Sequence, residues 1–90
     1  MNQTLTTVND SVVRLGVVEG EFHWHEHEGE DEFFLVLDGV LEIDVEGEDT
    51  FVLGPQQGVT IPRGVMQRPR APKRTVIVMV EPATVQPTGD

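Results

Sequence analysis

Apolar and polar residues alternate with a period of two, or form short apolar runs, through most of the chain. The alternation is clearest in residues 41–45, where Leu41, Ile43 and Val45 fall on one side and two acids on the other. A period of two is the pattern of a half-buried strand, whereas an amphipathic helix would repeat every 3.6 residues over a longer stretch. No ten residues show that longer period, so the pattern predicts an all-β protein.

Short strands are predicted between turns rich in glycine and proline. They cover residues 12–18, 21–27, 33–37, 40–45, 50–53, 59–61, 66–70 and 75–80. Because Asp38-Gly39 is a tight-turn dipeptide, the strands on either side of it are expected to form a hairpin. Prolines are expected to end the strand at 66–70. Many short strands favour an antiparallel sandwich or barrel, with an N-terminal arm over 1–10, one barrel domain over 11–82 and a C-terminal tail over 83–90.

The composition excludes several classes of partner. Six basic residues against 16 acidic ones give a net charge of -10, which disfavours nucleic acid and anionic membranes. There is no cysteine, so neither disulfides nor thiolate ligands are available. The first ten residues are polar and do not read as a signal peptide, and no apolar run approaches the length of a membrane span. We therefore expect a soluble, cytoplasmic protein.

Three histidines occupy alternate positions, His23, His25 and His27, and Glu32 follows them after an acidic loop. In a strand, residues i and i+2 point to the same face about 7 Å apart, so two imidazoles can converge on one ion. His23 and His27 are about 13–14 Å apart along such a strand and cannot both join it. A His-x-His pair with a carboxylate favours a first-row transition metal.

The spacing from His25-x-His27 through Glu32 to Gly39 resembles the first motif of the cupin superfamily. Residues 11–90 are similar to small single-domain conserved-barrel cupins, some of which are called mannose-6-phosphate isomerase-like. The resemblance implies an antiparallel, jelly-roll-like β-barrel with a metal ion near one mouth, held by His25, His27 and Glu32.

The second cupin motif is degraded in this chain. Where the family has a third histidine, the chain has Gln67, and Gln56 and Ala71 replace a glycine and an asparagine. Gln67 is open to three interpretations: a weak fourth ligand, a hydrogen-bonding residue near bound water, or a spectator. Loss of one imidazole should weaken metal affinity by several kcal/mol, given a total of about 10–16 kcal/mol for a four-ligand zinc site.

Two further groups of residues invite a functional interpretation. Phe22 and Trp24 are expected on the outer face of their strand, where they would form a homodimer interface or be covered by the N-terminal segment or strand 75–80. Five basic residues are expected near the barrel mouth, to bind a ligand's carboxylate or phosphate or to pair with the acidic loop. They are Arg63, Arg68, Arg70, Lys73 and Arg74.

These observations leave three function classes open. The first is a metal-binding barrel that holds zinc, nickel, manganese or iron and a small-molecule ligand. The second is an enzyme at the same site, since two histidines and one carboxylate leave coordination positions open, as in non-haem iron oxygenases. Because the chain has no tyrosine or cysteine, a general base would have to be His23 or an acid. The third is a metal-free interaction barrel, which the replacement by Gln67 favours.

Overall fold

The computed structural model describes residues 1–83, which form seven strands and contain no helix. The predicted tail over 83–90 lies outside the described residues from position 84 onward. Within residues 1–83 there is accordingly no helix long and apolar enough to cross a membrane. The strands are β1 (Asn2–Val8), β2 (Ser11–Glu21), β3 (Glu32–Asp38), β4 (Leu41–Val45), β5 (Phe51–Leu53), β6 (Gly58–Ile61) and β7 (Gln67–Pro82).

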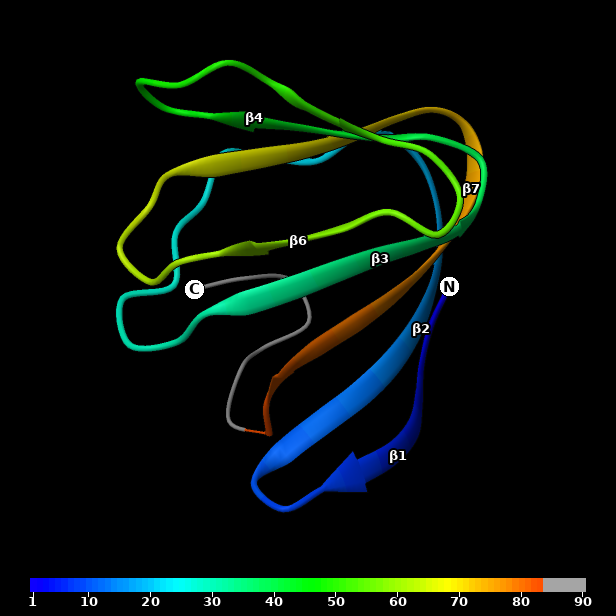
Figure 1. Cartoon of the computed structure of the whole chain (residues 1–90), viewed down its shortest axis with the longest axis vertical. Coiled ribbons are helices and arrows are strands. Elements are labelled where there is room, and N and C mark those ends of the chain that lie inside the picture. The colour runs from blue at the N-terminus through cyan, green and yellow to red at the C-terminus, as the bar shows by residue number, and fades with distance from the viewer. Residues whose placement is uncertain (84–90) are drawn as a thin grey trace.

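The long strand β7 organises the molecule. It pairs with β2 along most of its length, while β4 pairs with its first four residues and β3 with residues 76–80. Figure 1 shows β7 and β2 bending together, so that two layers face each other across the interior. One layer holds β5, β4 and the first part of β7, and the other holds β1, β2, the second part of β7, β3 and β6. All of the pairings are antiparallel, as predicted.

The hairpin predicted around Asp38-Gly39 is wrong. β3 pairs with β6 and β7, and β4 pairs with β5 and β7, so the turn carries the chain from one layer to the other. Gly39 has a φ of 96°, and a Cβ there would lie 2.9 Å from the Cα of Thr75. The glycine therefore allows the turn to cross closely over β7 at its bend, a contact between distant segments that local turn patterns do not encode.

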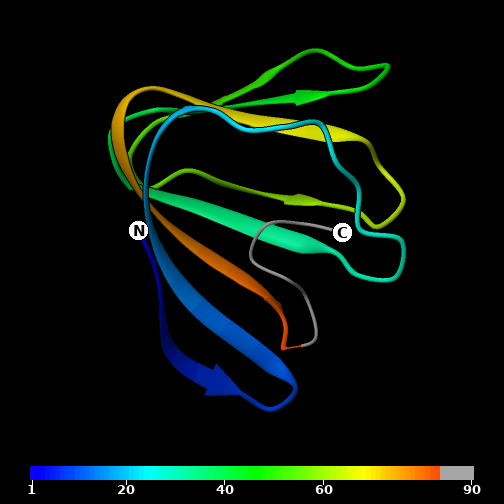
Figure 2. The same cartoon turned by 180° about the vertical axis from the view of Figure 1, so that it is seen from behind.

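Two predicted strand boundaries are also wrong. The strands expected at 66–70 and 75–80 are one continuous strand: Pro69 occupies a paired position, and around Pro72 only the register with β2 shifts, between Ala71 and Thr75. Pro69 still pairs with Ile43 and accepts a hydrogen bond from the Phe22 N–H at 3.1 Å. Conversely, residues 22–27 lie outside the regular strands and form the connection from β2 to β3 that Figure 2 shows from behind.

The core lies between the two layers and is built from alternate residues. β3, β4 and most of β7 show buried side chains at every second position, the pattern expected when one face of a strand points inward. The same inner surface also carries polar residues, which is unusual for a core of this size. The buried polar residues are His27, Glu32, Gln67, Thr75 and Glu81.

Candidate metal centre

The connection between β2 and β3, residues 22–31, brings the histidines to the inner surface without being a regular strand. A bulge precedes Gly20, whose φ of 96° redirects the chain. The connection is then fixed to the start of β7, because His25 and Gln67 exchange two backbone hydrogen bonds of 2.9 Å. In such a pair the two side chains leave the same face of the sheet, so position 67 projects beside the His25 imidazole.

The turn between β6 and β7 fixes the second part of this connection. The Gly64 N–H donates a hydrogen bond to the His27 carbonyl oxygen at 2.8 Å. The Arg63 N–H donates one to the Asp31 carboxylate at 2.9 Å, and this hydrogen bond lowers the pKa of Asp31. His27 and the following β3 are thus held at both ends of the acidic loop.

Ligand atoms of His25, His27 and Glu32 all lie within 4.8 Å of one another. His27 and Glu32 are 3% and 7% exposed, and His25 is partly buried. His27 Nε2 is 3.4 Å from Glu32 Oε1. Two donor atoms on one ion at about 2.1 Å are separated by about 3.0–3.4 Å, so this set fits a single ion with small side-chain adjustments.

The tautomer of His25 also suits a metal ligand. Its Nδ1 lies 3.1 Å from the backbone carbonyl oxygen of His23. Because a carbonyl oxygen can only accept, Nδ1 carries the proton and the lone pair of the neutral ring is on Nε2. Ligating histidines in proteins commonly donate their other ring N–H in this way. The His23 ring is centred 5.2 Å from the His25 ring but is not part of the three-residue set.

Gln67 is completely buried beside the three candidate ligands. Its side-chain Nε2 donates a hydrogen bond of 3.3 Å to Glu32 Oε1. Its Oε1 is buried and has no hydrogen-bond partner among the residues that the structure describes. A buried amide oxygen normally has a partner, and an electron-rich oxygen next to two imidazoles and a carboxylate suits a cation or its bound water.

A second buried acid, Glu81, lies next to Glu32 and was missed by the sequence interpretation. Arg14 Nη1 contacts Glu81 Oε1 at 3.1 Å. Burial, followed by the hydrogen bond and the charge of Glu32, raises the pKa of Glu81 to about 8, although Arg14 acts in the opposite direction. Glu81 therefore holds a proton more readily than an exposed carboxyl group does. Its position two residues after buried Met79 could have revealed it, because alternate residues of that strand point inward.

Three of the five basic residues form ion pairs, and one of them, Arg63, pairs with the acidic loop as one of the two alternatives proposed. Arg68 and Arg70 contact the Asp44 carboxylate at 2.8 and 2.7 Å, and their hydrogen bonds hold the pKa of Asp44 well below its usual range, with Arg70 the largest cause. Arg63 lies 3.4 Å from Asp31 of the acidic loop. These guanidinium groups are already matched with carboxylates of this chain.

The two aromatic residues of the connection lie in different environments. Phe22 was expected on the outer face; it borders a cavity next to His23, after the irregularity at Gly20, and is still 44% exposed. Trp24 is 43% exposed, and the Arg68 guanidinium lies 5.2 Å from its ring centre. Both side chains are therefore exposed enough to contact a second copy.

Comparison with known proteins identifies the family. The Cupin domain family model matches residues 11–81, which include all of the candidate ligands. The chain belongs to the cupin family. This membership and the strand arrangement confirm the predicted resemblance and fold class.

Two cupins of known structure are similar to this chain. A cupin-2 domain containing protein from Shewanella frigidimarina NCIMB 400 is 35% identical, with a TM-score of 0.87 over 91% of this chain and 79% of that one. An RmlC-like cupin from the same organism is 20% identical, with a TM-score of 0.78 over 92% and 76% of the chains, and it shows the fold alone. The uncharacterised YdbB of Bacillus subtilis (strain 168) is 44% identical over 80 residues, 89% of this cupin and 71% of YdbB.

Proposed function

We propose that this cupin binds one divalent transition metal ion through His25, His27 and Glu32 and holds a small molecule beside it. The observation that carries the proposal is the convergence of two imidazoles and one carboxylate within 4.8 Å on the inner surface of the barrel. Nitrogen donors with a carboxylate suit zinc, nickel, manganese or iron better than magnesium or calcium, which prefer oxygen ligands alone.

Neighbouring residues support this donor set. Gln67 orients the Glu32 carboxylate through its 3.3 Å hydrogen bond, and its own amide oxygen is available as a weak further ligand. The contact between His23 and His25 sets the tautomer that ligation requires. An ion held by three side chains retains open coordination positions and would act as a Lewis acid on an oxygen of the bound molecule.

A cavity of about 510 Å³ borders His25 and Glu32, which gives a small molecule access to the proposed ion. This volume lies within the range of about 300–1,000 Å³ typical of small-molecule sites.

The second candidate is an enzyme at the same site, favoured by the open coordination positions. Oxygen consumption by the Fe(II)-loaded protein with a bound organic molecule would distinguish the enzyme from a binding protein.

The metal proposal is tested by elemental analysis of protein purified without chelator, followed by titration with zinc, nickel, manganese and iron. We expect one ion per chain and a melting temperature that rises with metal concentration, because a ligand of the folded state stabilises it by mass action. His27→Ala should abolish both effects. The matched control is His23→Ala, which removes an imidazole from the same connection and should retain the metal. An equal loss of metal binding in His27→Ala and His23→Ala, or no metal binding by the natural chain, would contradict the proposal.

A further inference from the structure

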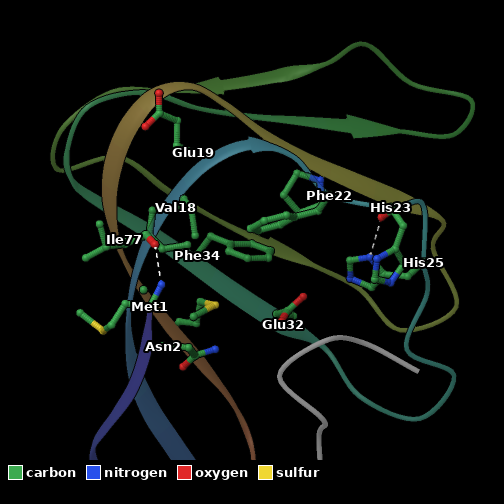
Figure 3. A pocket seen from close by; sticks show the side chains of 14 residues that line it. Met1, Asn2, Val18, Glu19, Phe22, His23, His25, Glu32, Phe34 and Ile77 are labelled. Atoms are coloured by element: carbon green, nitrogen blue, oxygen red, sulfur yellow. Dashed lines mark hydrogen bonds between the residues drawn. The ribbon is translucent and has the colours of Figure 1, made fainter.

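The cavity beside the candidate metal centre has one polar end and one apolar end. Figure 3 shows His23, His25 and Glu32 together at one end, and Val18, Phe34 and Ile77 toward the other. Phe34, Ile77 and Met79 are buried core residues whose side chains form the apolar wall. A molecule that fills this space would therefore contact the proposed ion at one end and hydrocarbon at the other.

Gly16 contributes to the width of the apolar end. It lies on β2 opposite Ile77, and a Cβ at this position would approach the Cε of Met79 to 3.1 Å and the Cγ1 of Ile77 to 3.2 Å. Any side chain at position 16 would thus press on two residues of the cavity wall. The glycine leaves room for these two side chains, so a larger residue here would push on them and change the shape of the apolar end.

No lysine or arginine side chain lines the cavity among the described residues. The amino group of Met1 borders it but donates a hydrogen bond to the Val17 carbonyl oxygen at 3.0 Å. Of the two acids in the lining, Glu19 is exposed and points away in Figure 3, while Glu32 is a candidate ligand. A phosphate group would find no guanidinium or ammonium side chain here, and the net charge of -10 would repel it.

We propose that the ligand of this cavity is a small amphipathic molecule with a two-oxygen chelating head and an unphosphorylated apolar body. The head lies toward His25 and Glu32, and the body lies against Phe34, Ile77 and Met79. This inference rests on the proposed metal site and adds the ligand's chemical class. It excludes sugar phosphates as ligands of this cavity.

The test uses the zinc-loaded chain and a series of hydroxamates, which present the same two-oxygen head on apolar bodies of increasing length. Titration calorimetry from acetohydroxamate to hexanohydroxamate should show affinity rising about fourfold per methylene, as the transfer free energy of a methylene group predicts. Phosphoglycolohydroxamate, which has the same head and a phosphate, should bind more weakly than butanohydroxamate. Affinity that does not rise along the series, or a preference for the phosphorylated probe, would overturn the inference.

A glycine variant locates the binding in this cavity. Gly16→Ala should weaken the binding of hexanohydroxamate more than that of acetohydroxamate, because the added methyl group narrows the apolar end of the cavity. The matched control is Gly54→Ala, where the only nearby atom is a Gln57 side-chain oxygen 3.6 Å away and no cavity is involved. Equal affinities in both variants would place the hydroxamate body elsewhere. Metal content is measured first. A chain that binds no metal overturns both proposals. A metal-loaded chain whose hydroxamate affinity does not change with body length overturns only the proposal about the ligand.

Discussion

Replacing Gln67 with histidine is the sharpest test of the candidate metal centre. The two backbone hydrogen bonds between Gln67 and His25 place their side chains on the same face. The Gln67 side chain already reaches Glu32, since its Nε2 lies 3.3 Å from the carboxylate oxygen. An imidazole at this position would therefore reach the same ion as His25, His27 and Glu32. The Gln67→His substitution should therefore tighten metal binding.

The expected gain follows from the value of one ligand. Four-ligand structural zinc sites are worth about 10–16 kcal/mol in total, which is about 2.5–4 kcal/mol per ligand. If the amide oxygen of Gln67 is a weak ligand in the natural chain, part of this is already present, so we expect a gain of about 2 kcal/mol, or about 30-fold in Kd. The side chain is 1% exposed, so an imidazole there gains no alternative contact with solvent.

Competition with a chromophoric chelator measures this difference directly, and Gln67→Leu is the matched control. Leucine has a similar volume but provides neither a ligand atom nor the hydrogen bond to Glu32, a contact worth about 1.5–3 kcal/mol when one partner is charged. Gln67→Leu should bind metal more weakly than the natural chain and should unfold at a lower urea concentration. If Gln67→His binds metal no more tightly than Gln67→Leu, the side chain at position 67 does not face the ion and the geometric argument is refuted.

Three further predictions concern the turn, the second buried acid and the exposed surface. In urea unfolding, Gly39→Ala should lower the free energy of unfolding by more than about 1 kcal/mol beyond the loss caused by Gly47→Ala. Both glycines have a positive φ, but only Gly39 lies against Thr75. Equal losses of stability in the two variants would refute the steric argument. Because the pKa of Glu81 is raised, its contribution to stability is present below about pH 4.5 and is lost as the pH rises toward 8. The melting temperature of the metal-free protein should therefore fall between pH 5 and 8.5 more than that of Glu81→Gln, and parallel curves would refute this assignment. If the exposed Trp24 ring contacts a second copy, Trp24→Glu should reduce the mass measured by light scattering, whereas an unchanged mass would exclude Trp24 from the interface.

Local patterns predicted the fold class because they report burial directly. Alternate apolar residues in β4 point inward as expected. The spacing of His25, His27 and Glu32 predicted that they would lie together, and in the structure they do. Spacing succeeds here because a short connection limits how far apart its ends can be. The family resemblance placed Gln67 near the proposed ion, but its pairing with His25 was not predicted, since nothing local to residue 67 indicates its partner.

Features that depend on contacts between distant segments could not be predicted in this way. The Asp38-Gly39 dipeptide has the sequence of a hairpin turn, but the strands on either side pair with different parts of β7. Phe22 borders the cavity next to His23 because the regular strand ends at Glu21, after the register shift near Gly20, and the alternation stops there. The role of Glu81 depends on Glu32 and Arg14, which lie far from it in the sequence.

The energetics of the inner surface argue that its polar residues are present for binding. A buried oxygen without a hydrogen bond, such as Oε1 of Gln67 among the described residues, costs about 1–3 kcal/mol. A domain of this size is stable by only about 5–15 kcal/mol, so one such group is a substantial fraction of the total. Apolar residues at the positions of His27, Glu32, Gln67 and Glu81 would complete the core without this cost. Because local rules of stability are most often broken where a protein has a function, the cluster favours a binding site over an interaction barrel that needs no interior chemistry.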